Sequence, residues 1–195
     1  PFHEAAAHLL ITLDGNDREA LDRETEQLGE MCLERGALEV LVADDSALRD
    51  RLWDARRKII EALQNLSPEH VMDTQDIVVP RSNLPEALNR IKTVAQKYNL
   101  QIVCFGHSGD GNVHVNIIKN LPEEEWREKA PSAADEIYRI ADDLGGMITG
   151  EHGIGLTRKD HLAMSLDTKT IELMKMIKDD FDPNGILNPG KIFSN

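Results

Sequence analysis

The chain has 195 residues, of which 41% are hydrophobic and 29% charged, so it can form one generous domain or two small domains with a buried core. The formal net charge of -13 argues against a nucleic-acid-binding protein, because phosphate binding needs a basic face. No apolar run approaches the ~18 residues of a membrane span, and the separated Cys32 and Cys104 favour two reduced thiols in a cytoplasmic protein.

The first third of the chain predicts alternating strands and helices. The stretch AAAHLLITLDG alternates apolar and polar positions and closes with an Asp-Gly turn signal, which is typical of a strand. The next stretch carries apolar residues at helical spacing and stops at Gly36. In chain order we expect a strand over 5–15, a helix over 16–36, a strand over 37–44 and a helix from Asp45 or Ser46 to about Leu66.

The rest of the chain continues this alternation. We expect a strand over 71–80, a helix from about Pro85 to Asn99, strands over 100–106 and 112–119, a helix over 123–144 with Pro131 as a point of interruption, a short strand over 146–155 that runs into a glycine-rich loop, and a helix over 169–180. No linker or fixed-period repeat divides the sequence. We therefore predict one α+β domain over 1–195, a ferredoxin-like-type antiparallel sheet covered by helices.

The stretch GHSGDGNVHVNI, residues 106–117, combines glycines, histidines and a strand pattern. Period two places His114 and Asn116 on one polar face of the strand, with valines on the other face. His107 precedes a turn made by residues 109–111, so a hairpin would bring the two imidazoles together as half of a metal site. Ordinary hydrogen-bonded histidines remain the alternative. A phosphate-binding loop is rejected, because the strand-then-helix context and the lysine are missing.

The stretch GEHGIG, residues 150–155, places a glutamate beside a histidine in a glycine-bounded loop. Glu151 would supply a third, oxygen ligand, and three protein ligands leave the open position of a catalytic metal site. Two imidazoles and a carboxylate suit Zn²⁺ first, and alternatively Mn²⁺ or Fe²⁺. His152 would then be free to act as a general base near neutral pH.

Three segments together resemble a known family: GHSGDGNVHVNI, TGEHGIG and DPNGILNPGKIF. They are similar to the C-terminal domain of FAD-linked oxidases in the vanillyl-alcohol oxidase class. The nearest branch holds the glycolate oxidase flavin subunit, D-lactate dehydrogenase and D-2-hydroxyglutarate dehydrogenase. The resemblance covers essentially the whole chain. It implies that FAD is carried by a separate N-terminal domain, absent from these 195 residues, and that this part caps the substrate site.

The resemblance also implies a role for particular residues. It makes His107, His114 and Glu151 the metal ligands and His152 the catalytic base. It implies that Asn116 makes a polar contact with substrate or metal-bound groups. It also implies that Arg56, with Arg57 as fallback, pairs with the substrate carboxylate, and that Asn188 in the NPGK tail lies near the flavin edge.

The expected function is oxidation of glycolate or D-lactate to the 2-oxo acid by an FAD-dependent dehydrogenase or oxidase. A hydroxyglutarate dehydrogenase would be expected to offer a lysine before the strand at 71–80, where this chain has Thr74 and Gln75, and Ile60 replaces a polar helix position. Expected partners are the chain's own FAD-binding domain, an iron–sulfur or electron-acceptor subunit, and further copies in a homo-oligomer. The isolated chain should be inactive. The alternative is a freestanding metal-binding or assembly module without redox chemistry.

Overall fold

The structure, a computed structural model, describes residues 5–193. The chain divides into two compact units, Pro1–Lys58 and Ile59–Asn195, and each is described by itself. The single domain over 1–195 therefore stays a prediction. No helix of the described residues is long and apolar enough to cross a membrane.

The first unit contains two helices that begin where the sequence predicts. Helix α1 spans Arg18–Glu34 and helix α2 spans Ser46–Arg57. The Asp17 side chain accepts a hydrogen bond from Ala20 N at 3.1 Å, and the Asp45 side chain accepts one from Leu48 N at 2.8 Å. Each carboxylate satisfies an N–H group that the first helical turn leaves without a partner.

Two strands predicted in this unit are wrong. Residues 5–15 and 37–44 have no strand structure, and their leucines, isoleucine and valines are largely exposed, Leu9 to 71% and Leu38 to 69%. A strand forms only with a hydrogen-bonded neighbour, and the described residues pair neither segment into a sheet. Alternation of apolar and polar residues alone therefore does not produce a strand.

The predicted helix from residue 45 to residue 66 is also interrupted. Lys58 ends α2, and a separate helix α3 covers Ile59–Gln64.

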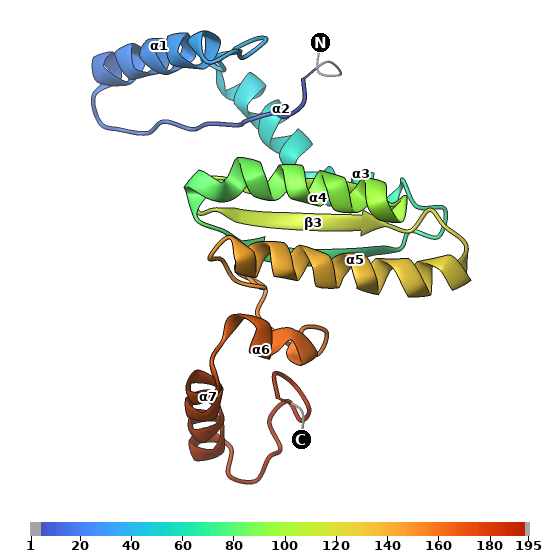
Figure 1. The fold of residues 1–195 in the computed structure, drawn as a ribbon. Coiled ribbons are helices and arrows are strands. Elements are labelled where there is room, and N and C mark those ends of the chain that lie inside the picture. Colours follow the sequence, from blue (N-terminus) through green and yellow to red (C-terminus); the bar gives the residue numbers. More distant parts are fainter. Residues whose placement is uncertain (1–4, 194–195) are drawn as a thin grey trace. The chain divides into compact units, whose positions relative to one another are not determined.

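The second unit is built on an antiparallel sheet. Its strands are β1 (Met72–Val78), β2 (Gln101–His107) and β3 (Asn112–Ile118), in the order β1-β3-β2. Helices α4 (Leu84–Tyr98) and α5 (Glu123–Asp143) cover one face of this sheet (Figure 1). Helix α5 continues through Pro131 without a break.

The chain returns beside β1 after α5. Val78 and Met147 exchange backbone hydrogen bonds of 3.1 and 2.9 Å, and Gly150 N donates to Asp76 O at 2.8 Å. The strand predicted over 146–155 is thus reduced to two isolated bridges. The order of returning segment, β1, β3 and β2, with two crossing helices, is the ferredoxin-like arrangement. The predicted fold class is confirmed.

Period two divides the central strand β3 into two faces. Val113, Val115 and Ile117 point into the core with the apolar residues of α4 and α5. The opposite face carries His114 and Asn116, and both are buried although they are polar. The helices therefore leave a polar sheet face available for a site.

The remainder of the second unit is helical and irregular. Its elements are η1 (Arg81–Asn83), η2 (Lys159–His161), α6 (Leu162–Ser165) and α7 (Thr168–Phe181), the last close to the predicted helix over 169–180. In the tail, Asp182 accepts hydrogen bonds from Ile186 N and Leu187 N, both at 2.9 Å, and so closes the DPNG turn.

Candidate metal centre

The hairpin between β2 and β3 brings the two predicted histidine ligands together. His107 ends β2 opposite Asn112, and His114 lies two residues further along β3. The two imidazole rings meet edge to face, with centroids 5.4 Å apart. Gly111 makes this turn possible, because it has φ +75° and an added Cβ would lie 2.0 Å from Val79 O. The predicted pairing of the imidazoles is present in the structure.

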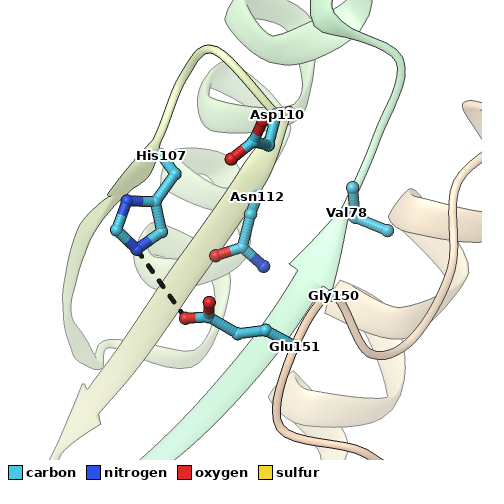
Figure 2. A pocket seen from close by; sticks show the side chains of 6 residues that line it. All are labelled: Val78, His107, Asp110, Asn112, Gly150 and Glu151. Atoms are coloured by element: carbon cyan, nitrogen blue, oxygen red, sulfur yellow. Dashed lines mark ion pairs between the residues drawn. The ribbon is translucent and has the colours of Figure 1, made fainter.

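The loop that follows Gly150 brings the third predicted ligand to the same place. Glu151 Oε1 lies 3.2 Å from His114 Nε2 and 3.7 Å from His107 Nε2, the pair drawn in Figure 2. His152 lies beside them, with its ring stacked on that of His114 at 5.1 Å and its Nε2 3.7 Å from Glu151 Oε1. Residues from two strands and a distant loop thus converge on one point.

Asp76 on β1 anchors this loop, a role that was not among the predictions from the sequence. Its Oδ2 accepts backbone N–H groups from Gly150, Glu151 and His152 at 3.0, 2.8 and 2.7 Å. Its Oδ1 accepts Asn112 Nδ2 at 2.7 Å. Burial raises the pKa of Asp76, but the hydrogen bonds from Asn112 and the His152 and Glu151 amides outweigh it, so the pKa lies well below its usual value. Asp76 is therefore ionised.

The buried His114 is held in its neutral form. Burial is the largest influence on its pKa and lowers it, whereas the carboxylates of Asp76 and Glu151 raise it by less, so the net shift is downward. A neutral imidazole is the form that binds a metal ion.

The donor atoms fit a divalent metal ion. One atom each from Asp76, His114, Glu151 and His152 lie within 4.8 Å of one another. Among the described residues, the buried polar atoms without a hydrogen-bond partner include Asn112 Oδ1, whose amide nitrogen donates to Asp76 in this centre. Mixed imidazole and carboxylate donors suit Zn²⁺, Mn²⁺ and Fe²⁺. This group of four includes His152 but not His107, whose Nε2 lies 3.7 Å from Glu151 Oε1.

A cavity of about 310 Å³ is lined by two of the predicted ligands, His107 and Glu151. Figure 2 shows the side chains of His107 and Glu151 approaching each other at its edge. Its volume suits a small molecule. The cavity is lined by Val78, His107, Asp110, Asn112, Gly150 and Glu151.

The structure gives Asn116 an internal set of partners. Its amide donates to Val103 O and His114 O, both at 3.2 Å, and its Oδ1 accepts from Thr74 Oγ1 at 3.0 Å. The predicted contact with substrate or metal-bound groups stays a prediction, and the observed amide bridges the strands.

Two further predicted residues lie away from the cluster in the sequence. Arg56 is half-buried on α2 of the first unit, whereas Arg57 is exposed and forms an ion pair with Asp54. Asn188 lies in the tail with φ +49°, and its carbonyl accepts from Lys191 N at 3.3 Å. Their contacts with substrate and flavin stay predictions.

Comparison with known proteins agrees with the motifs. Among similar proteins are D-lactate dehydrogenase of Anaerostipes hadrus, 42% identical, and glycolate oxidase subunit GlcD of Bacillus subtilis, 38% identical, each over 97% of this chain and 40% of the relative. D-2-hydroxyglutarate dehydrogenase of Stutzerimonas stutzeri is 35% identical over 85% of this chain and 36% of the relative. The chain thus spans about 40% of the length of the first two relatives.

The family description "FAD linked oxidases, C-terminal domain" matches residues 2–192, nearly the whole chain. The match includes every residue of the centre described above, and it agrees with the ferredoxin-like sheet of the second unit. This chain belongs to the family of C-terminal domains of FAD-linked oxidases.

Proposed function

We propose that this chain forms the substrate side of an FAD-dependent 2-hydroxy-acid dehydrogenase or oxidase that acts on glycolate or D-lactate. The observation that carries the proposal is the convergence of His107, His114, Glu151 and His152, from separate segments, beside a small cavity. The names of the similar proteins point to the same chemistry.

His107, His114 and Glu151 would hold the metal ion, with zinc as the first choice. A metal ion bound there would supply Lewis-acid polarisation of the substrate 2-hydroxyl. His114 is fixed by the sheet, and Glu151 reaches it from the loop at 3.2 Å. The half-exposed Glu151 and His107 leave one side of the centre open to a small acid.

His152 would take the proton of the substrate hydroxyl. Its ring is stacked on that of His114, and its Nε2 lies 3.7 Å from Glu151 Oε1, next to the proposed metal position. The side chain is 46% exposed, so it can also pass the proton to water. Bound FAD, held outside this chain, would supply the acceptor for the α-hydrogen.

The choice of a small monocarboxylic acid is based on two side chains of β1, Thr74 and Gln75. Gln75 is buried and accepts a hydrogen bond from Tyr138 on α5, and Thr74 donates to Asn116. Neither residue offers a cation to a second substrate carboxylate. For the single carboxylate we assign Arg56, from the resemblance of LWDARRKI to the family, with Arg57 as the fallback. Asn188 remains assigned to the flavin edge.

A freestanding metal-binding or assembly module is the second candidate. It is favoured by one observation, that the donor cluster lies entirely within this chain. A cytoplasmic location, a homo-oligomer and an iron–sulfur or electron-acceptor subunit belong to the first proposal and would be unnecessary for the second.

The two proposals separate in an activity assay. The complete reading frame that contains this chain is expressed, and dye reduction is followed with glycolate, D-lactate and D-2-hydroxyglutarate. We expect FAD to copurify and the two small acids to be oxidised. Absence of FAD and of turnover with all three acids would contradict the first proposal. The 195-residue chain with added FAD serves as the matched control and should not reduce dye, because free flavin is not positioned.

A further inference from the structure

Asp76 lies at the base of the centre, and the proposed chemistry gives it no part. Its Oδ2 accepts three backbone N–H groups of residues 150–152 and the Thr149 hydroxyl at 3.2 Å. Its Oδ1 accepts the Asn112 amide. The three backbone N–H groups can only donate, so the Oδ2 position requires an atom that accepts. An ionised carboxylate offers two charged acceptor oxygens here, whereas an amide offers a single neutral one.

The same carboxylate also lies next to the Nδ1 side of the His114 ring. Asp76 and His114 are directly paired across β1 and β3, and Asp76 Oδ1 lies 3.3 Å from His114 Nδ1. That nitrogen is buried and has no hydrogen-bond partner among the described residues. A hydrogen on Nδ1 would face the carboxylate and leave the Nε2 lone pair toward Glu151 Oε1, 3.2 Å away. A carboxylate behind a metal-binding histidine fixes its tautomer in this way.

We infer that Asp76 is a positioning residue of the metal centre and not one of its ligands. It fixes His114 with Nε2 toward the metal, and it clamps residues 149–152 so that Glu151 and His152 face His114. Its Oδ2 already accepts four hydrogen bonds, and its Oδ1 accepts the Asn112 amide and lies 3.3 Å from His114 Nδ1, so both oxygen atoms serve the residues around the metal position. This inference rests on the metal centre of the proposed function.

The test compares the wild-type 195-residue chain with Asp76→Asn. Asp135→Asn is the matched control, because Asp135 also pairs with a histidine, His161 Nε2 at 2.6 Å, outside the centre. We expect zinc affinity in calorimetry to fall about 10- to 100-fold for Asp76→Asn and to stay unchanged for the control. At saturation, the visible spectrum of the Co²⁺ form should be the same as in wild type, because the ligands are unchanged.

Amide hydrogen exchange without metal gives a second readout. Exchange at Gly150, Glu151 and His152 should be faster in Asp76→Asn than in wild type, because a neutral amide oxygen accepts these N–H groups more weakly than a carboxylate does. Thr149→Val removes a single donor and keeps the carboxylate, so it should lower zinc affinity in the same direction by less. If Asp76→Asn does not fold, zinc affinity is compared between wild type and Thr149→Val instead.

The outcomes separate the two proposals. Equal zinc affinity with unchanged exchange would overturn the positioning role while leaving the metal centre intact. A changed Co²⁺ spectrum would make Asp76 a ligand and overturn the inference as well. A wild-type chain that binds no zinc would overturn the metal centre, and the His114 part of this inference with it, whereas the exchange rates would still decide whether Asp76 clamps the loop.

Discussion

The chain holds His114 and His152 in different ways, although their rings are stacked with 7° between their planes. His114 lies on the central strand, with hydrogen-bonded neighbours on both sides, and its side chain is only 7% exposed. His152 lies on a loop, and its side chain is 46% exposed. A ligand needs a fixed position, whereas a base must reach both substrate and solvent. The comparison thus suggests a rigid half and an accessible half of one centre.

Removal of the accessible imidazole should produce the largest effect. In the flavin-containing enzyme, His152→Ala should lower turnover by about 10²- to 10⁴-fold, the usual contribution of a general base. Metal content should be retained, because His107, His114 and Glu151 remain. Steady-state dye reduction and elemental analysis measure the two quantities. His70→Asn, which changes an exposed histidine in a left-handed turn, is the control, and near-normal turnover of His152→Ala would remove the base assignment.

Loss of the loop carboxylate should affect both halves together. Glu151→Ala should lose turnover and also weaken metal binding by more than the roughly 100-fold that the loss of an outer partner costs. Glu151→Gln keeps the shape of the side chain and tests whether the charge is needed. A Glu151→Ala enzyme that retains its metal would show that the loop supplies no ligand.

The position of the loop should also depend on Gly150. A Cβ there would lie 1.9 Å from Asn112 Nδ2, which is buried and hydrogen-bonded to Asp76. Gly150→Ala should therefore lower the free energy of unfolding by roughly 1–3 kcal/mol, the usual cost of overpacking. Gly109→Ala is the matched control, because nothing lies within 4 Å of its added Cβ. Equal thermal stability of the two variants would contradict the close approach of the loop to β3.

The smallest effect concerns the dependence of stability on pH. The pKa of Asp76 is lowered from 3.8 in the folded chain, so its contribution to stability is complete above that value and is lost as pH falls further. The stability difference between wild type and Asp76→Asn should shrink as the pH falls below about 4, where the carboxylate of the unfolded chain takes up its proton. Urea unfolding at several pH values measures it. A difference that grows in acid would contradict the shift.

The sheet of the second unit could be predicted because its strands carry alternation and also have neighbours. Residues 5–15 and 37–44 show a similar alternation but no strand, because pairing depends on other segments and not on the pattern itself. The end of α2 at Lys58 could not be predicted, because no glycine or proline lies there. Local pattern therefore indicates what a segment can become, and pairing decides what it is.

The donors of the centre could be predicted because two histidines and a Glu-His pair stand out beside glycines. The role of Asp76 could not be predicted, since a polar residue in a strand usually faces solvent. The available signal was its place in Met72–Val78, whose sequence MDTQDIV carries polar residues on both faces of the strand. That signal becomes meaningful only through the register that pairs Asp76 with His114.

The measurement that tests the central claim most directly is zinc calorimetry on the metal-stripped 195-residue chain. Wild type should bind one zinc ion, and His114→Ala should bind it far more weakly, because the rigid strand ligand is lost. His161→Ala, which removes a histidine paired with Asp135 outside the centre, should bind as wild type does. Equal affinity of wild type and His114→Ala would contradict the metal centre.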